Sequence, residues 1–144
     1  MGIELMGKVL VTARIENLKD QHAAELGLIS ADQIRGVEVI DALVDTGATQ
    51  LSMPKRLIEQ LGLRGTDIRR ARTTAGTVNV QIYEAVRLTI QGRNCLSDVT
   101  ELPDDCPVLI GQLPLEAMDF VVDPRGQRLI GNPAHGGEQM IELY

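Results

Sequence analysis

The chain has 144 residues, and 44% of them are hydrophobic, which is enough for the core of one domain. The formal net charge is −6, from 14 Lys and Arg against 20 Asp and Glu, and the aromatic residues are two Tyr and one Phe without Trp. This composition argues against a general nucleic-acid binder or a binder of acidic membranes, because both need basic surfaces and base stacking needs aromatic side chains.

The chain shows no pattern typical of a membrane, secreted or metal-binding protein. No stretch approaches the 18 or so apolar residues of a spanning helix, and the N-terminus lacks the basic start and long apolar centre of a signal peptide. Cys95 and Cys106 are therefore expected as free thiols, and neither His22 nor His135 has a zinc-like spacing with them. We expect a cytoplasmic protein without a metal or other cofactor, and without a nucleic-acid or membrane partner.

The first predicted element is a half-buried strand over residues 7–15. Apolar residues alternate with mostly polar neighbours, at Val9, Val11, Ala13 and Ile15. The first five residues are expected to be a poorly ordered leader or an extension of an edge strand.

Residues 16–35 show no regular apolar period, which predicts a long loop insertion with possible helical turns. Long loops in a compact domain are usually functional or mobile. The segment either borders a functional cleft or is a surface elaboration without contact to it.

A short apolar strand over residues 40–44 leads Asp45 directly into a turn. Its alternating apolar residues are Ile40, Ala42 and Val44, a pattern typical of a buried strand. Gly47 permits a sharp turn and a close approach by other backbone, and the Thr46 hydroxyl can donate and accept hydrogen bonds. A buried Asp45 carboxylate would need hydrogen bonds, a counter-charge or a second acid with which to share a proton.

A short strand and a short helix follow the turn. Residues 50–53 continue as a strand, Pro54 occupies a helix start, and Gly62 marks the stop of a helix over Lys55–Leu61. The apolar face of this helix is predicted to pack in the core.

The next predicted element is a hairpin with a glycine tip. Residues 69–74 and 78–83 are its strands, and Ala75 and Gly76 lie between them. A basic cluster precedes the tip: Arg64, Arg69, Arg70 and Arg72. This cluster either steers an acidic peptide by long-range attraction or is the solvated face of a strand.

The remaining pattern predicts further strands and one more helix. Single strands are expected over residues 86–91, 96–102, 108–111 and 139–144. A hairpin of two strands is expected over residues 120–130, and a helix over residues 112–119. Gly111 is expected where a side chain would obstruct the turn that carries Asp45.

Three of these elements carry a resemblance to a known family. The sequence Asp45-Thr46-Gly47-Ala48 after a strand, the flap-like turn over 73–77, and Val108-Leu109-Ile110-Gly111 before a helix occur in the order found in retropepsin-like aspartic proteases of clan AA. The resemblance covers about Gly36 to Gly131 and is that of a single-domain protein of cellular or bacterial type. It implies a mainly β fold over 1–144: a closed acid-protease-like β-barrel with one or two short helices, forming half of a two-fold symmetric dimer.

The resemblance also implies site residues and a mechanism. The catalytic residues would be Asp45, Thr46 and Gly47, and the substrate-binding residues would be Ala48, Thr74, Ala75, Gly76, Thr77 and Ile110. Because the chain has one Asp-Thr-Gly, the second aspartate would come from a second copy. The implied function is an aspartic endopeptidase that cleaves a peptide or protein substrate as a homodimer, through a water activated by two Asp45 carboxylates.

The chain departs from the viral pattern at two places. Thr49-Gln50 replaces acidic residues, and Gln112-Leu113 replaces an Arg-Asn pair, so an ion pair near the active site is missing and a weaker dimer is expected. The C-terminal residues 131–144 show no clear match to the viral dimer strands. Two alternatives stay open: a non-catalytic dimer of the same fold that binds peptides or a protein partner, and an unrelated barrel with an incidental Asp-Thr-Gly turn.

Overall fold

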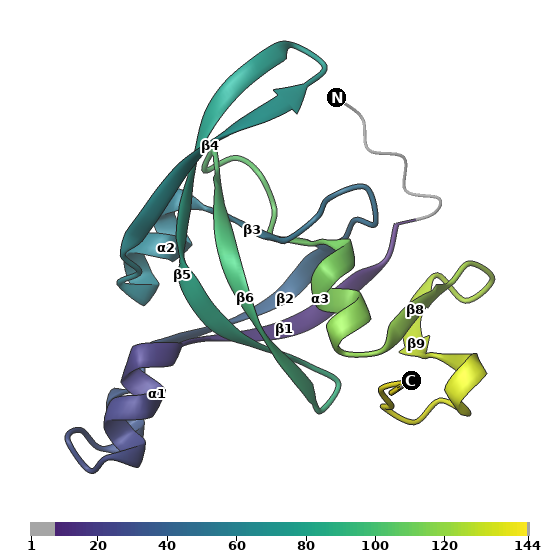
Figure 1. The fold of residues 1–144 in the computed structure, drawn as a ribbon, viewed down its shortest axis with the longest axis horizontal. Helices are drawn as coiled ribbons and strands as arrows, with labels where there is room; N and C mark the ends of the chain where they lie inside the picture. The colour runs from purple at the N-terminus through teal and green to yellow at the C-terminus, as the bar shows by residue number, and fades with distance from the viewer. Residues whose placement is uncertain (1–7, 144) are drawn as a thin grey trace.

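A computed structural model describes residues 8–143 and shows a mainly β fold (Figure 1). The strands are β1 (Leu10–Asn17), β2 (Gly36–Val44), β3 (Leu51–Pro54), β4 (Gly65–Thr73), β5 (Gly76–Ile90), β6 (Arg93–Leu102), β7 (Leu109–Ile110), β8 (Phe120–Asp123) and β9 (Arg128–Gly131). The helices are α1 (Leu18–Glu25), α2 (Lys55–Leu61) and α3 (Gln112–Ala117), with short 3-10 turns η1 (Ala31–Gln33) and η2 (Pro133–His135). The first five residues, expected as a leader, lie outside the described part of the chain.

Seven strands form one sheet in the order β1-β2-β7-β3-β6-β5-β4. Strand β1 pairs with β2 on one side and with β5 on the other, so the pairings return to their starting strand and only β4 lies outside this ring. Every strand of the ring therefore has a hydrogen-bonded neighbour on both sides, which leaves few exposed strand edges.

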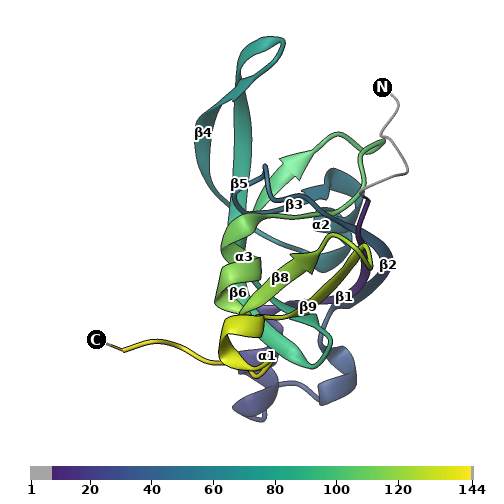
Figure 2. The same cartoon turned by 90° about the vertical axis from the view of Figure 1, so that its right-hand side faces the viewer.

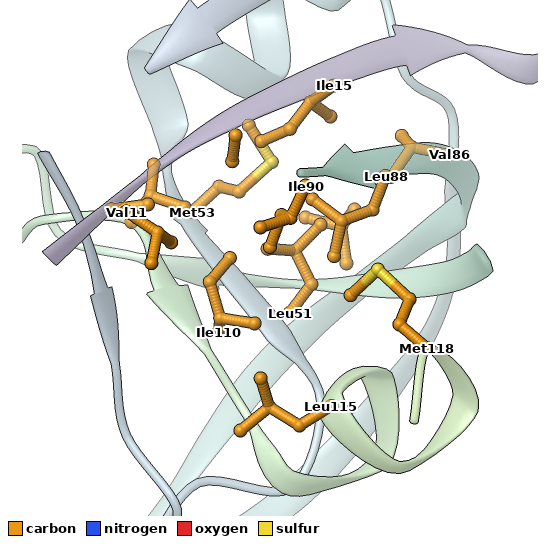
Figure 3. Close-up of a cluster of buried hydrophobic side chains, with 14 of the residues drawn as sticks. Val11, Ile15, Leu51, Met53, Val86, Leu88, Ile90, Ile110, Leu115 and Met118 are labelled. Atoms are coloured by element: carbon orange, nitrogen blue, oxygen red, sulfur yellow. The ribbon is translucent and has the colours of Figure 1, made fainter. Parts of the chain in front are cut away.

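The hydrophobic core fills the inside of this ring of strands (Figure 3). Val9, Val11, Ala13 and Ile15 are each at most 8% exposed, which confirms the alternation predicted for the first strand. Leu115 and Met118, in and just after α3, add their buried side chains to the cluster. The core thus joins α3 to the strands, which matters below because α3 contacts the Asp45 turn.

The prediction of simple alternation in β2 is wrong at Ile40, whose side chain is 75% exposed. Ala42 lies opposite Val11, whereas Val39 lies opposite Ala13, so two residues of β2 face one residue of β1 at this point. Such a β-bulge reverses which side chains point inward.

The long loop predicted over residues 16–35 contains the helical turns that the prediction allowed, as α1 and η1, but its first two residues are strand. Residues 16 and 17 belong to β1, and α1 follows directly. The side chain of Asn17 accepts a hydrogen bond from the backbone N–H of Asp20, which caps α1, and donates to the carbonyl oxygen of Leu61 at 2.8 Å. The Arg35 guanidinium binds the Asp20 carboxylate through Nε at 2.8 Å and lowers the pKa of that group. These polar contacts fold the segment at the end of the molecule remote from the β4–β5 tip (Figure 1).

The predicted hairpin with the glycine tip is formed by β4 and β5. It projects beyond the other strands in both views (Figures 1 and 2). The two strands predicted over 78–83 and 86–91 are one continuous strand β5, with a bulge where its register against β6 shifts between Tyr83 and Val86. The helix predicted over Lys55–Leu61 is confirmed as α2, and Gly62 ends it with a φ of 65°.

The C-terminal part departs from the expected sheet. Strands β8 and β9 form a separate two-stranded sheet, and residues 139–143 form no strand, while Tyr144 lies outside the described residues. His135 holds this region together: its Nδ1 lies 2.6 Å from the Asp119 carboxylate and its Nε2 lies 2.9 Å from that of Glu142. Asp119 also accepts from the backbone N–H of Met140 at 3.0 Å.

This His135 cluster predicts a dependence of stability on pH. Asp119 and Glu142 raise the pKa of His135, so the stabilisation by its charged form is complete below the unfolded value of about 6.5 and is lost as the pH rises through the raised value. The pKa of Asp119 is lowered, chiefly by its bond to His135, so its contribution is lost only as the pH falls below about 3.9. Replacing His135 with Ala should therefore lower the melting temperature more at pH 5.5 than at pH 8.5. An equal loss at both pH values would contradict this role of the charge.

Cys95 and Cys106 are free thiols, as expected. Within residues 8–143, no helix has both the length and the apolar content needed to cross a membrane. The same residues contain no group of three or more His, Cys, Asp or Glu side chains that could hold a metal ion.

Candidate active site

Asp45 lies immediately after the last residue of β2, where the sequence predicts it. Its backbone N–H donates to the carbonyl oxygen of Ile110 at 2.9 Å. Ile110 pairs in parallel with Val44 before the turn and in antiparallel fashion with Leu51 after it. The two-residue strand β7 therefore lies between β2 and β3 and holds both ends of the loop over residues 45–50.

The loop is also bonded to itself. The N–H of Gly47 donates to the Asp45 Oδ1 atom at 3.0 Å, and the N–H of Ala48 donates to the Asp45 carbonyl at 3.0 Å. A side chain of this kind that bonds two residues ahead is a common way to close a turn. The Asp45 Oδ2 atom accepts no hydrogen bond from the described residues, so one carboxylate oxygen is left for a ligand.

Gly47 has no positive φ, so the turn does not require glycine for its backbone angle. A Cβ atom at this position would instead lie 3.2 Å from the Asp45 Oδ1 atom. The expectation of a close approach by other backbone at Gly47 is therefore wrong, because the atom that approaches belongs to the Asp45 side chain.

The first residues of α3 hold the loop over residues 45–50 through backbone hydrogen bonds. The first N–H groups of a helix have no partner within the helix. Here the N–H of Gln112 donates to the carbonyl of Ala48 at 2.8 Å, and that of Leu113 donates to the carbonyl of Thr49 at 2.9 Å. The carbonyl groups of the loop therefore satisfy the first N–H groups of α3, and α3, anchored in the core by Leu115, holds the loop.

Gly111 is the closest point between these two segments. Its N–H donates to the Gln50 carbonyl at 3.1 Å, and a Cβ atom on Gly111 would lie 2.4 Å from that same oxygen. The prediction that a side chain here would obstruct the Asp45 turn is confirmed, because the obstructing atoms are loop backbone.

An open pocket of about 690 Å³ lies beside the Asp45 carboxylate. The loop forms one wall through Asp45, Gly47, Ala48, Thr49 and Gln50. Strand β4 contributes Arg69, Ala71, Arg72 and Thr73, and β5 and β6 contribute, among others, Val80, Ile82 and Glu101. The sequence analysis placed Ala48 near the site but assigned no role in it to Val80, Ile82 or Glu101. Period-two alternation along β4 would have placed Arg69, Ala71 and Thr73 on one face.

Other predicted site residues lie outside this pocket. Ile110, predicted to bind substrate, is 0% exposed and bonds to the loop through its carbonyl group. The neighbouring Leu109 lines the pocket. Residues 74–77 form the exposed hairpin tip and do not line the pocket in this single chain, and Thr46 is exposed at the apex of the loop. Residues 16–35 contribute nothing to the pocket lining.

Glu101 is the second carboxylate in the pocket wall. It accepts a hydrogen bond from the Tyr83 hydroxyl at 2.6 Å, and this bond is the main reason that the pKa of Tyr83 is raised to about 12. Glu101 is therefore fixed to β5 and is not a partner of Asp45 within the chain.

The comparisons with known proteins bear on this arrangement. A protein-family model described as gag-polyprotein putative aspartyl protease matches residues 31–117, which is more than half of the chain. The chain belongs to this aspartyl protease family. The comparison with curated proteins gave no significant match.

The aspartyl protease match confirms the resemblance seen in the sequence. It includes the Asp45 loop, the β4–β5 hairpin, β7 and α3, and it ends at Ala117, short of the Gly131 limit expected from the sequence. The family model extends over all these elements. The alternative of an unrelated barrel with an incidental Asp-Thr-Gly turn is therefore excluded. The family assignment suggests aspartic protease activity and a peptide substrate.

Proposed function

We propose that the protein is an aspartic endopeptidase that acts as a homodimer, with Asp45 of each chain forming one catalytic pair. The observation that carries this proposal is Asp45 itself: it borders the pocket of about 690 Å³, its loop is fixed at both ends, and its Oδ2 atom has no hydrogen bond within residues 8–143. A chain with one such aspartate needs a second copy to supply the other acid.

The chemistry follows from two acids that share one proton. Like charges at hydrogen-bonding distance do not both ionise readily, so one Asp45 is a carboxylate while the other is protonated. The carboxylate takes a proton from water, whose oxygen attacks the peptide carbonyl carbon, while the protonated acid donates to the carbonyl oxygen. The acid that took the water proton then gives it to the amide nitrogen, the other carboxylate takes a proton from a hydroxyl of the tetrahedral intermediate, and the C–N bond breaks to release the amine and the carboxylic acid.

The remaining residues have supporting roles in this proposal. Thr46 is exposed at the apex of the loop, where its hydroxyl can bond to the loop of the second copy. Gly47 presents backbone to the peptide. The ring of strand pairings is the closed acid-protease-like barrel, and the β4–β5 hairpin is the flap that closes over the peptide, bringing residues 74–77 to the substrate.

The test is the dependence of cleavage on association. Purified protein should cleave members of a peptide library at acidic or neutral pH, and the rate per chain should fall when the protein is diluted below its dimer dissociation constant. Sedimentation over the same concentrations gives that constant, and Gln112-Leu113 in place of the viral Arg-Asn pair predicts a weak dimer.

Monomers that cleave peptides at a rate per chain independent of dilution would rule out the shared site. A stable dimer that cleaves no peptide at any pH would favour the alternative, a non-catalytic dimer that binds peptides or a protein partner.

A further inference from the structure

A second pocket, of about 280 Å³, lies between β6 and the first turn of α3. The Sγ atom of Cys95 lies 4.0 Å from the carbonyl oxygen of Pro114, so β6 and α3 pack directly against each other here (Figure 1). Strand β5 carries its bulge at the same level, where Glu84 and Ala85 both lie opposite Asp98. Ala85 lines the pocket, and its small side chain leaves space above the sheet.

Two large apolar side chains of this second pocket remain in contact with solvent. Leu96 is 52% exposed and Leu113 is 50% exposed, and both line the pocket. Apolar surface gathered in a hollow is typical of a binding site. Among the described residues that line it, Asp98 alone is charged, and its carboxylate disfavours an acidic ligand. An apolar cavity of about 150 Å³ holds a benzene molecule, so the second pocket has room for a large apolar side chain.

The two pockets lie on one face of β6. Side chains alternate between the faces of a strand, and here residues 94, 96 and 98 are exposed whereas residues 95, 97 and 99 are more buried. Leu96 and Asp98 line the second pocket, and Thr100 and Leu102, which follow on the same face, line the pocket at Asp45. Leu96 and Leu102 are about 20 Å apart along an extended strand. One face of β6 therefore connects the two pockets.

Gln50 lies at the boundary, because it lines both pockets. Its side-chain Oε1 atom is shielded from solvent and accepts no hydrogen bond from any residue of the described range 8–143. A buried carbonyl oxygen without a donor is unfavourable. A peptide that passes from one pocket to the other carries backbone N–H groups past Gln50, and one of these groups can supply the missing bond.

We propose that the second pocket is a distal subsite of the substrate groove. A peptide whose cleaved bond lies at Asp45 continues in extended form along β6, passes Gln50 and places a large apolar side chain between Leu96 and Leu113. The preferred substrates are therefore peptides with an apolar residue several positions from the cleaved bond. This inference rests on the proposed function, because it extends the same groove. Leu96 and Leu113 determine specificity and take no part in the reaction itself.

The test measures binding separately from cleavage. The probe is a set of decapeptide pools in which one position in turn is fixed as Leu or as Asn. The pools are bound to Asp45→Asn protein, so that turnover cannot interfere. For at least one position, the Leu pool should bind about tenfold more tightly than the Asn pool, because the pocket removes the Leu side chain from water.

Three single substitutions in the Asp45→Asn background locate the effect. Leu96→Asn and Leu113→Asn should each remove the preference for Leu at this position and keep the preferences at other positions. Leu10→Asn is the matched control, because Leu10 is also a strand residue, is 53% exposed and lines neither pocket. The preference should therefore remain in that variant. A preference that survives in either pocket variant, or is lost equally in Leu10→Asn, would overturn the subsite.

Sedimentation of the same variants distinguishes a peptide from a second copy of the chain as the occupant. Neither Leu96→Asn nor Leu113→Asn should weaken the dimer. A dimer about tenfold weaker in both pocket variants, with no change in Leu10→Asn, would assign this surface to the contact between copies and overturn the subsite.

Cleavage by the wild-type protein separates this inference from the proposed function. Product masses locate the cleaved bond, and the position that favours Leu should lie beyond the two residues that flank it, with kcat/KM about tenfold higher for the Leu pool. Equal cleavage of the Leu and Asn pools, or a preference only next to the cleaved bond, retains the protease and overturns the subsite. A preference in binding that depends on Leu96, without any cleavage, supports the peptide groove and contradicts the endopeptidase. Binding of no pool would overturn the subsite.

Discussion

Replacing Asp45 with Asn is expected to abolish peptide cleavage while the protein stays folded. The amide keeps the shape of the carboxylate, and its oxygen can still accept the 3.0 Å hydrogen bond from the Gly47 N–H. It cannot share a proton with a second acid or take one from water. Turnover of library peptides is the activity readout, and circular dichroism and the melting temperature show that the fold is intact.

The same variant tests whether one site uses two chains. If subunits exchange, a tenfold excess of Asp45→Asn protein leaves about one wild-type chain in eleven with a wild-type partner, so the rate per wild-type chain should fall to about a tenth. An unchanged rate under conditions of proven exchange would refute the shared site. Measurable turnover by the pure Asn variant would refute the role of Asp45 itself.

The second large effect is expected at Gly111. A Cβ atom in Gly111→Ala would lie 2.4 Å from the Gln50 carbonyl oxygen and 2.6 Å from the Thr49 carbonyl carbon, and both are backbone atoms. The loop over residues 45–50 must move, which strains the bonds that hold it to β7 and α3. We expect a loss of about 3 kcal/mol or more in the free energy of unfolding, together with loss of activity.

Gly47→Ala is the matched control for this prediction. It adds the same methyl group within the loop that Gly111 contacts, yet that Cβ atom would lie 3.2 Å from the Asp45 Oδ1 atom, a side-chain contact, and the residue has no positive φ. Chemical denaturation should therefore show a much smaller loss for Gly47→Ala than for Gly111→Ala. Similar losses at the two glycines would show that the contact between Gly111 and the loop backbone does not control stability.

The elements that were predictable from the sequence are those with a local signal. Pro54 and Gly62 mark both ends of α2, and Gly76 marks the end of the hairpin turn, because these residues favour particular backbone angles whatever surrounds them. The contact between Gly111 and the Asp45 loop was also predictable, since glycine before a helix and beside a turn is typical of a close backbone approach.

The features that were missed depend on partners distant in the sequence. Helix α1 has no buried residue, so it has no apolar stripe to detect, and it is held by the Asn17 cap and the bond between Arg35 and Asp20. The exposure of Ile40 results from a bulge that exists only in the pairing of β2 with β1. The pocket residues of β5 and β6 become neighbours of Asp45 only when the strands close into a ring.

Strand β5 has a mechanical consequence, because one continuous backbone joins the hairpin tip to the core. Residues 76–79 are exposed, whereas Val86, Leu88 and Ile90 are at most 1% exposed and lie in the core cluster. The hairpin therefore behaves like a cantilever: its buried end is fixed in the core, and its exposed tip undergoes the largest displacement when the strand bends. Sequence changes at the tip can therefore alter what the hairpin covers without disturbing the packing, whereas changes at the buried end alter how far it bends.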